Sequence, residues 1–166
     1  MRIRPIAHSD IASLHGLARE VGGGFASLLD EGDFLSGKIA RALAAFERQE
    51  NQGQQLYLFV LEDERNGEVV GCCAIESNVG QGVPYYRYHL GSLMHASPRL
   101  SLHRRLETLT LCSEHTDNVR LCSLFLRESW RRRDRNGVLL SRSRWLSWLS
   151  FTPPFPLKYG SICAGH

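Results

Sequence analysis

Residues 55–76 read QLYLFVLEDERNGEVVGCCAIE. The stretch holds two runs rich in apolar, aromatic and β-branched residues, at positions 55–62 and 69–76, with the dipeptide Asn66-Gly67 between them. Such residues favour strands, and an Asn-Gly pair between two strand-like runs is a strong signal for a tight hairpin turn. The stretch therefore predicts two antiparallel neighbours that begin a meander.

The residues before this hairpin predict a strand and two helices. Residues 2–4 alternate up to Pro5, and His8-Ser9-Asp10 offers N-cap candidates before apolar residues at helical spacing. Gly22-Gly23-Gly24 would end that helix. A second start at Asp33 leads into one apolar stripe, with three cations, Lys38, Arg41 and Arg48, placed off it. The stripe is Leu35, Ile39, Leu43 and Phe46.

The residues after the hairpin predict further strands and a last helix. Residues 85–95 are strand-like, and residues 121–126 (LCSLFL) form a short apolar run typical of a strand buried on both faces. Leucines from Leu139 onward indicate a helix that ends before Pro153-Pro154. The expected fold is α+β, a mixed and largely antiparallel sheet flanked by helices. Residues 151–166 have no periodicity and predict an unpacked tail.

Composition limits the class of protein. A chain of 166 residues with 43% apolar and 22% charged residues fits one soluble domain, and it has no run long enough to span a membrane. The N-terminus lacks a secretory signal, so we expect a cytoplasmic protein with reduced cysteines that act as small hydrophobic residues. No histidine pair has metal-site spacing beside a carboxylate, so we expect no bound metal.

Seven arginines fall between positions 127 and 144. Such a cluster can hold the phosphates of a cofactor, bind nucleic acid or simply solvate a helix face. Few aromatics interleave with these arginines and no nucleic-acid-binding motif is visible, which disfavours the second reading. The run from the 121–126 strand through an arginine-rich loop to Asn136-Gly137 and a helix favours the first, since free N–H groups at a helix start bind anions. The seven are Arg127, Arg131, Arg132, Arg133, Arg135, Arg142 and Arg144.

Several segments in collinear order closely resemble arginine N-succinyltransferases of bacterial arginine catabolism. They include YLFVLED (57–63), LCSLFL (121–126) and NGVLLSRSR (136–144), with Ile3-Arg4-Pro5 and His95-Ala96-Ser97. The resemblance covers residues 1–150, and it implies a GNAT-like half-domain that uses succinyl-CoA to acylate the α-amino group of L-arginine. It leaves residues 151–166 as an unmatched tail, which suggests a frameshift or premature stop.

The resemblance also implies site residues. Leu124 occupies the family's succinyl-CoA position, where strand backbone can pair with the pantetheine arm, although the residue also fits an ordinary core leucine. In the GNAT phosphate loop, R/Q-x-x-G-x-G/A, Arg132, Arg135 and Gly137 take the first, fourth and sixth positions, and Asn136 lies among them. Arg135 replaces a glycine, so its β-carbon could block close approach of the loop to the phosphate, although its guanidinium could bind phosphate instead.

The resemblance places the catalytic histidine beyond this chain, so no catalytic residue is expected here and independent activity is doubtful. Tyr85, Arg87 and His89 depart from the family's P-W-Y-N-Y-R-V-G pattern, which would alter substrate fit. Glu76 could pair with the cationic substrate, but a surface carboxylate without a role is the simpler reading. The alternative function is a non-catalytic subunit or regulatory module that binds acyl-CoA or a full-length partner in a homo- or hetero-oligomer, with no nucleic acid or membrane partner.

Overall fold

The hairpin predicted from residues 55–76 is present in the computed structural model, which describes residues 1–23, 25–47, 53–82 and 84–150. Strands β2 (Gln55–Asp63) and β3 (Glu68–Ser77) pair antiparallel. The turn places Gly67 at φ +73°, a conformation that glycine adopts without a steric penalty. The side chain of Asn66 accepts a hydrogen bond from the Glu68 N–H at 3.0 Å. The Asn-Gly pair therefore lies in the turn, as expected, but as the last two residues of a four-residue loop in which the Gly67 N–H donates to the Asp63 carbonyl at 2.8 Å.

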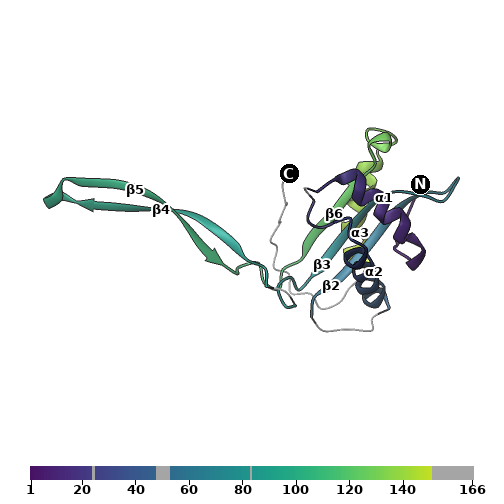
Figure 1. The fold of residues 1–166 in the computed structure, drawn as a ribbon, viewed down its shortest axis with the longest axis horizontal. Helices are drawn as coiled ribbons and strands as arrows, with labels where there is room; N and C mark the ends of the chain where they lie inside the picture. The colour runs from purple at the N-terminus through teal and green to yellow at the C-terminus, as the bar shows by residue number, and fades with distance from the viewer. Residues whose placement is uncertain (24, 48–52, 83, 151–166) are drawn as a thin grey trace.

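Strands β1 (Arg2–Pro5) and β6 (Arg120–Leu126) complete a four-stranded sheet in the order β1-β2-β3-β6. Every neighbouring pair in it is antiparallel. Figure 1 shows this sheet as the centre of a compact body, with the N-terminal strand at one edge and β6 at the other. The α+β class with a largely antiparallel sheet is confirmed.

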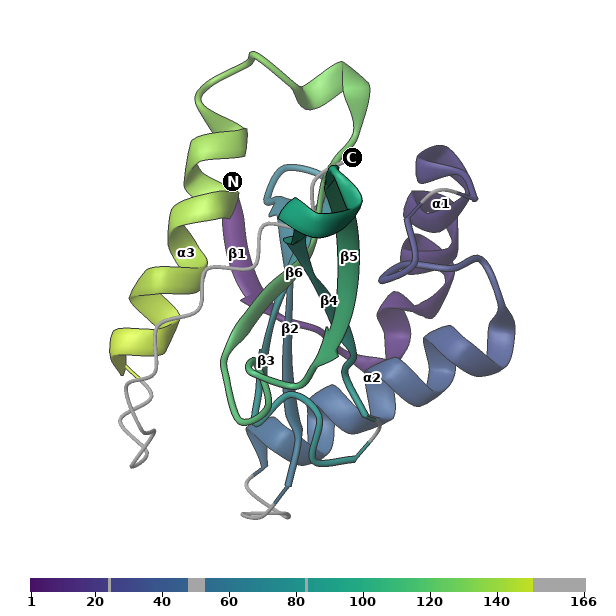
Figure 2. The same cartoon turned by 90° about the vertical axis from the view of Figure 1, so that its left-hand side faces the viewer.

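Helices cover both faces of the sheet. Helices α1 (Ile11–Val21) and α2 (Gly32–Phe46) lie on one face, and α3 (Asn136–Ser150) lies on the other (Figure 2). Because side chains alternate along a strand, β2 supplies both cores. Leu58 and Val60 pack with the α1 and α2 side, whereas Phe59 and Leu61 pack with the α3 side. The adjacent cysteines of β3, Cys72 and Cys73, divide in the same way.

Those two cysteines act as small apolar residues, as expected. Both side chains are fully buried. Burial raises the pKa of the Cys72 thiol to about 12 and that of Cys73 to about 11. Neither forms a reactive thiolate at neutral pH.

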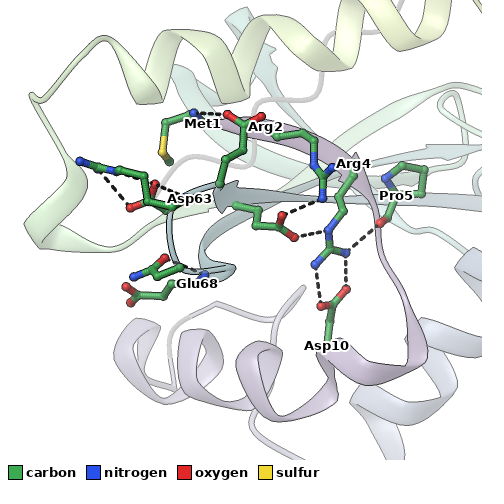
Figure 3. Close-up of polar contacts among 11 residues, drawn as sticks. Met1, Arg2, Arg4, Pro5, Asp10, Asp63 and Glu68 are labelled. Atoms are coloured by element: carbon green, nitrogen blue, oxygen red, sulfur yellow. Dashed lines mark hydrogen bonds and ion pairs between the residues drawn. The ribbon is translucent and has the colours of Figure 1, made fainter.

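A charged cluster attaches the first strand to the start of α1 (Figure 3). The Arg4 guanidinium donates to both carboxylate oxygens of Asp10, at 2.7 and 2.9 Å, and it also bonds to Glu62 on β2. Burial raises the pKa of Asp10, but the bonds from Arg4 and from the Ala7 N–H outweigh it and hold the pKa below its ordinary value. The N-cap candidate Asp10 therefore binds β1 and does not cap α1 through its side chain.

The prediction for strand β6 is wrong in one respect, the burial of Leu124. Residues 121–126 were predicted to be buried on both faces, and Phe125 and Leu126 are buried, but Leu124 is 40% exposed. The strand lies at the edge of the sheet, and its register against β3 is interrupted between Cys72 and Ala74. This irregularity, which the apolar pattern does not encode, turns Leu124 outward.

Strands β4 (Arg87–Ser97) and β5 (Leu102–Cys112) form a separate two-stranded ribbon, here called the arm. Figure 1 shows the arm projecting well beyond the body. Its first strand was predicted over residues 85–95. No range was predicted for its return strand, in which Leu102, Leu106 and Leu109 are spaced by four and three residues as on a helix.

One face of the arm is apolar near the body. Tyr88 pairs across the strands with Leu111, and Leu90 pairs with Leu109. These four side chains share one face, and Leu90 and Leu109 are 67% and 68% exposed. Within the described part of the chain, no helix or third strand pairs with or covers this ribbon.

Gly71 provides a test of how closely β3, β6 and α3 pack. A Cβ atom added there would lie 2.7 Å from the Phe125 carbonyl oxygen and 3.2 Å from Leu140 Cδ2. We expect Gly71→Ala to lower the free energy of unfolding by about 1–3 kcal/mol, because backbone must move to relieve the contact.

The matched control is Gly37→Ala in α2, where an added Cβ meets nothing within 4 Å. That change should raise the free energy of unfolding by about 0.5–1 kcal/mol, because alanine is the better helix former. Urea unfolding followed by circular dichroism measures both variants. Equal stability of the two would show that the β3–β6 contact is looser than described.

Candidate functional site

The irregularity in β6 is a β-bulge. Ser123 and Leu124 together stand opposite the single residue Cys73, and Ser123 has φ +51°. Three contacts hold the bulge: Lys38 Nζ donates to Ser123 Oγ at 2.7 Å, Ser123 Oγ donates to the Ser27 carbonyl at 3.2 Å, and the Cys72 thiol donates to the Ser123 carbonyl at 3.3 Å. A strained residue held by its surroundings in this way is typical of a functional position.

Leu124, expected at the succinyl-CoA position, lies in this bulge on the outermost strand. The outer edge of β6 has no strand partner within the residues that the structure describes. An open edge presents backbone N–H and C=O groups that can pair with an extended, amide-bearing molecule. The exposure of Leu124 leaves that position accessible, and its role in binding stays a prediction.

The arginine-rich loop follows β6 directly and leads into α3. Arg132, Asp134 and Arg135 all have left-handed backbone, with φ of 57°, 49° and 56°. The loop therefore takes up at Arg135 the conformation that a glycine would favour, despite the replacement. Asn136 is buried, and its backbone N–H donates to the Arg133 carbonyl at 3.0 Å. Asn136 positions the start of the helix.

The loop arginines divide into two groups. Arg127, Arg131 and Arg133 contact other residues of the chain: Arg127 pairs with Glu68 at 3.5 Å, Arg131 donates to the Leu126 carbonyl at 2.9 Å, and Arg133 lies over the Trp130 ring. The side chains of Arg132 and Arg135 are exposed and form no hydrogen bond or ion pair with the described residues. The two arginines assigned by the GNAT loop pattern are thus available for an external anion.

Gly137 lies at the first turn of α3 in open space. A Cβ atom built there would meet only Leu126 Cδ2, at 4.0 Å. Neither packing nor a positive φ requires glycine at this position. Because Gly137 has no side chain, the start of α3 is accessible to a ligand.

A cleft of about 860 Å³ lies on the other side of the bulge, between α2 and the end of the sheet. It is lined by the loop before α2, one face of α2, and the ends of β2, β3 and β6. Cys122 of β6 lines it directly before the bulge, and burial raises the pKa of its thiol. Cys122 therefore supplies no thiolate nucleophile to the cleft at neutral pH. The other lining side chains include five charged ones. The charged ones are Asp33, Lys38, Arg41, Glu76 and Arg120.

Glu76 differs from the surface carboxylate that its position suggested. Its side chain is buried, and its Oε2 accepts two hydrogen bonds from Arg120, one of them from Nε at 2.8 Å. Arg120 in turn lies over the ring of Tyr85, 5.3 Å from its centroid. Glu76 is therefore already paired with a cation. Its partner Arg120 lies across the strands, so sequence spacing alone could not identify the pair.

Lys38 is the functional candidate that sequence reasoning missed. It lies three residues after Leu35 and beside Ile39, so it borders the buried stripe of α2 and is only 8% exposed. Burial lowers the pKa of its ammonium below the ordinary value. Its hydrogen-bond acceptors are Ser123 Oγ and the Ser27 carbonyl. The spacing from Leu35 is the signal that could have identified it.

Comparison with known proteins identifies the family. The sequence pattern that defines the family described as "Arginine N-succinyltransferase beta subunit" matches residues 1–155. The chain belongs to this family. It is 46% identical over 156 residues to the arginine N-succinyltransferase of Salmonella typhi, and 45% identical over 156 residues to that of Salmonella newport (strain SL254).

A solved structure supports the same assignment. The arginine/ornithine succinyltransferase subunit AI from Pseudomonas aeruginosa is 34% identical and matches with a TM-score of 0.79. The match covers 87% of this chain and 44% of that chain, and the two Salmonella matches each cover 94% of this chain and 45% of the relative. The chain therefore spans less than half the length of these relatives.

Two further observations concern metal-ligating side chains and membrane-spanning helices among the described residues. Their histidine, cysteine and acidic side chains form no group of three or more that could hold a metal ion. None of the helices in the described ranges combines the length and apolar character needed to cross a membrane.

Proposed function

We propose that this chain is the acyl-CoA-binding half of an arginine N-succinyltransferase, an enzyme that transfers the succinyl group of succinyl-CoA to the α-amino group of L-arginine. The observation that carries the proposal is the continuous run from the open, bulged β6 edge into a loop with two unpaired arginines and the start of α3. Such a run offers an amide-pairing edge next to an anion site.

Each site residue has a role in this proposal. The backbone around Leu124 pairs with the pantetheine arm, and the bulge orients the thioester. The Arg132 and Arg135 guanidinium groups bind phosphate oxygens, and the Gly137 N–H at the start of α3 faces the same anion. The parts are adjacent in sequence, so β6 and α3 alone position them.

The reaction needs groups that this half is not proposed to supply. A neutral amine attacks the thioester carbonyl, a base accepts its proton, and an acid assists the departing thiolate. By family resemblance the catalytic histidine lies in the other half of the longer relatives. We therefore assign binding of succinyl-CoA to this chain and completion of the reaction to a complementary half, within a cytoplasmic enzyme.

The alternative is a non-catalytic module that binds acyl-CoA and pairs with a full-length enzyme. The exposed apolar face of the arm favours it, because such a face is a common feature of protein interfaces. Self-association or hetero-oligomer formation without turnover would support this alternative.

Binding of CoA tests the proposal. We expect CoA and succinyl-CoA to bind the isolated chain weakly, with an affinity that falls as salt rises, because exposed charges at the loop are screened. Gly137→Val should weaken binding by about tenfold or more, since a branched side chain obstructs backbone approach to phosphate. Calorimetry measures both.

Folding of the Gly137→Val variant is the control, and it should be unaffected because a side chain there enters open space. A folded sample that gives no signal at millimolar CoA would contradict the assignment of the loop. So would equal affinity of the variant and the unmodified chain.

A further inference from the structure

The cleft beside the bulge holds more positive charge than its carboxylates balance. Lys38, Arg41 and Arg120 line it, against Glu76 and Asp33. Glu76 is bound by Arg120, whereas Arg41 reaches only to 4.0 Å from its other oxygen. The Arg41 side chain remains 52% exposed. One cationic charge is left over in the cleft.

That charge belongs to Lys38, which is buried without an anionic partner. Its two acceptors are neutral oxygens, Ser123 Oγ at 2.7 Å and the Ser27 carbonyl. The Phe34 ring lies 5.7 Å away and adds only a cation–π contact. Lys38 forms no ion pair within the described ranges of the chain. A buried charge without a counterion is costly, so an anion that enters the cleft gains electrostatic energy.

We propose that this cleft binds a small carboxylate, with the Arg41 guanidinium as its direct partner and the Lys38 ammonium as the buried charge behind it. A guanidinium suits a carboxylate because its N–H donors match the two oxygens. Of the two lining carboxylates, Glu76 is already bound by Arg120, so only Asp33 would be left for a cationic ligand. The net charge of the cleft therefore selects an anion.

The identity of the carboxylate rests on the proposed function. Cys122 and Arg120 of the cleft precede the bulge on β6, and the arginine-rich loop follows it. An acyl-CoA whose phosphates lie at the loop would extend along β6 with its acyl group directed toward the cleft. The carboxylate is then the free end of a dicarboxylic acyl group or the α-carboxylate of an amino acid acceptor.

Titration of the isotopically labelled chain with four small molecules tests this site. Succinate carries two carboxylates, and L-arginine carries a carboxylate and a guanidinium. Agmatine carries the guanidinium without a carboxylate, and succinamide is uncharged. We expect succinate or L-arginine to shift the amide resonances of α2 around Lys38 and Arg41, and we expect agmatine and succinamide not to. Binding of succinate alone indicates an acyl site, and binding of L-arginine alone indicates an acceptor site.

Two variants and one control make the test specific. Arg41→Gln, at a half-exposed position, should weaken carboxylate binding by about tenfold. Lys38→Met should also weaken it, and it removes the buried charge at similar volume. Arg19→Gln on α1, whose side chain is 73% exposed and outside the cleft, should bind as the unmodified chain does.

Binding of agmatine as tight as that of L-arginine would overturn the proposal, as would carboxylate binding that Arg41→Gln leaves unchanged. Absence of shifts at the cleft with succinate and L-arginine would also overturn it. None of these titrations uses CoA or turnover, so their failure would leave the CoA assignment intact. Conversely, loss of CoA binding would not affect them.

Discussion

The purified 166-residue chain should release no free thiol from succinyl-CoA in response to L-arginine. Loss of an acid-base group alone reduces acyl transfer by roughly two to four powers of ten, even when binding survives. We expect a larger loss here, because orientation of the acceptor is lost as well if the complementary half supplies part of its pocket. A colorimetric thiol assay with both substrates measures the rate.

The reference is a full-length relative assayed under the same conditions, such as the Salmonella typhi enzyme. Arginine-dependent thiol release at a comparable rate would show that a catalytic group lies in this chain. His115 would be the first residue to mutate, although it is already bonded to Asn118 and Arg87 at the base of the arm.

The arm should exchange its amide hydrogens about a thousandfold faster than the centre of the sheet. A two-stranded ribbon without a third strand or a covering helix is marginally stable in water, so it opens locally without unfolding of the body. Limited trypsin digestion should accordingly cut at Arg99, Arg104 and Arg105 before it cuts at Lys38 or Arg41 in α2 of the body. Hydrogen exchange read by mass spectrometry, with β2 and β3 as the internal reference, tests this expectation.

Replacement of exposed arm leucines provides the matched variants. Leu90→Ser and Leu109→Ser should leave the unfolding free energy of the body within about 0.5 kcal/mol, because both side chains are largely exposed. Leu58→Ala in β2 should cost about 2–5 kcal/mol, because Leu58 is fully buried. Arm amides as well protected as those of β2 would contradict the expectation and indicate that another molecule covers the ribbon.

The elements predicted best are those whose periodicity and turn chemistry agree. The β2–β3 hairpin combines strand-forming residues with Asn66-Gly67, and both signals depend on local interactions alone. The return strand β5 was not predicted, and the spacing of its leucines also fits a helix. Its conformation is determined by cross-strand pairing with β4, which a local pattern does not contain.

Sequence reasoning could propose only those parts of the candidate site whose residues are adjacent in the chain. The candidate residues Arg132, Arg135, Asn136 and Gly137 are contiguous, at the end of one loop and in the first turn of α3, so a family pattern could propose them, and their role in binding stays a prediction. The cleft is assembled from five separate segments, and the pairing of Glu76 with Arg120 spans 44 residues. The exposure of Leu124 depends on a bulge that follows from register against β3, and the sequence LCSLFL carries no sign of it.

The arm also determines how electric charge is distributed over the protein. Its four arginines, Arg87, Arg99, Arg104 and Arg105, and its single Glu107 give it a formal charge of +3, which equals the net charge of the whole chain. The remainder of the chain is consequently neutral in sum. Colloidal repulsion between molecules, and with it solubility near neutral pH, therefore depends on one slender extension. Any process that removes or neutralises that extension would leave an isoelectric body.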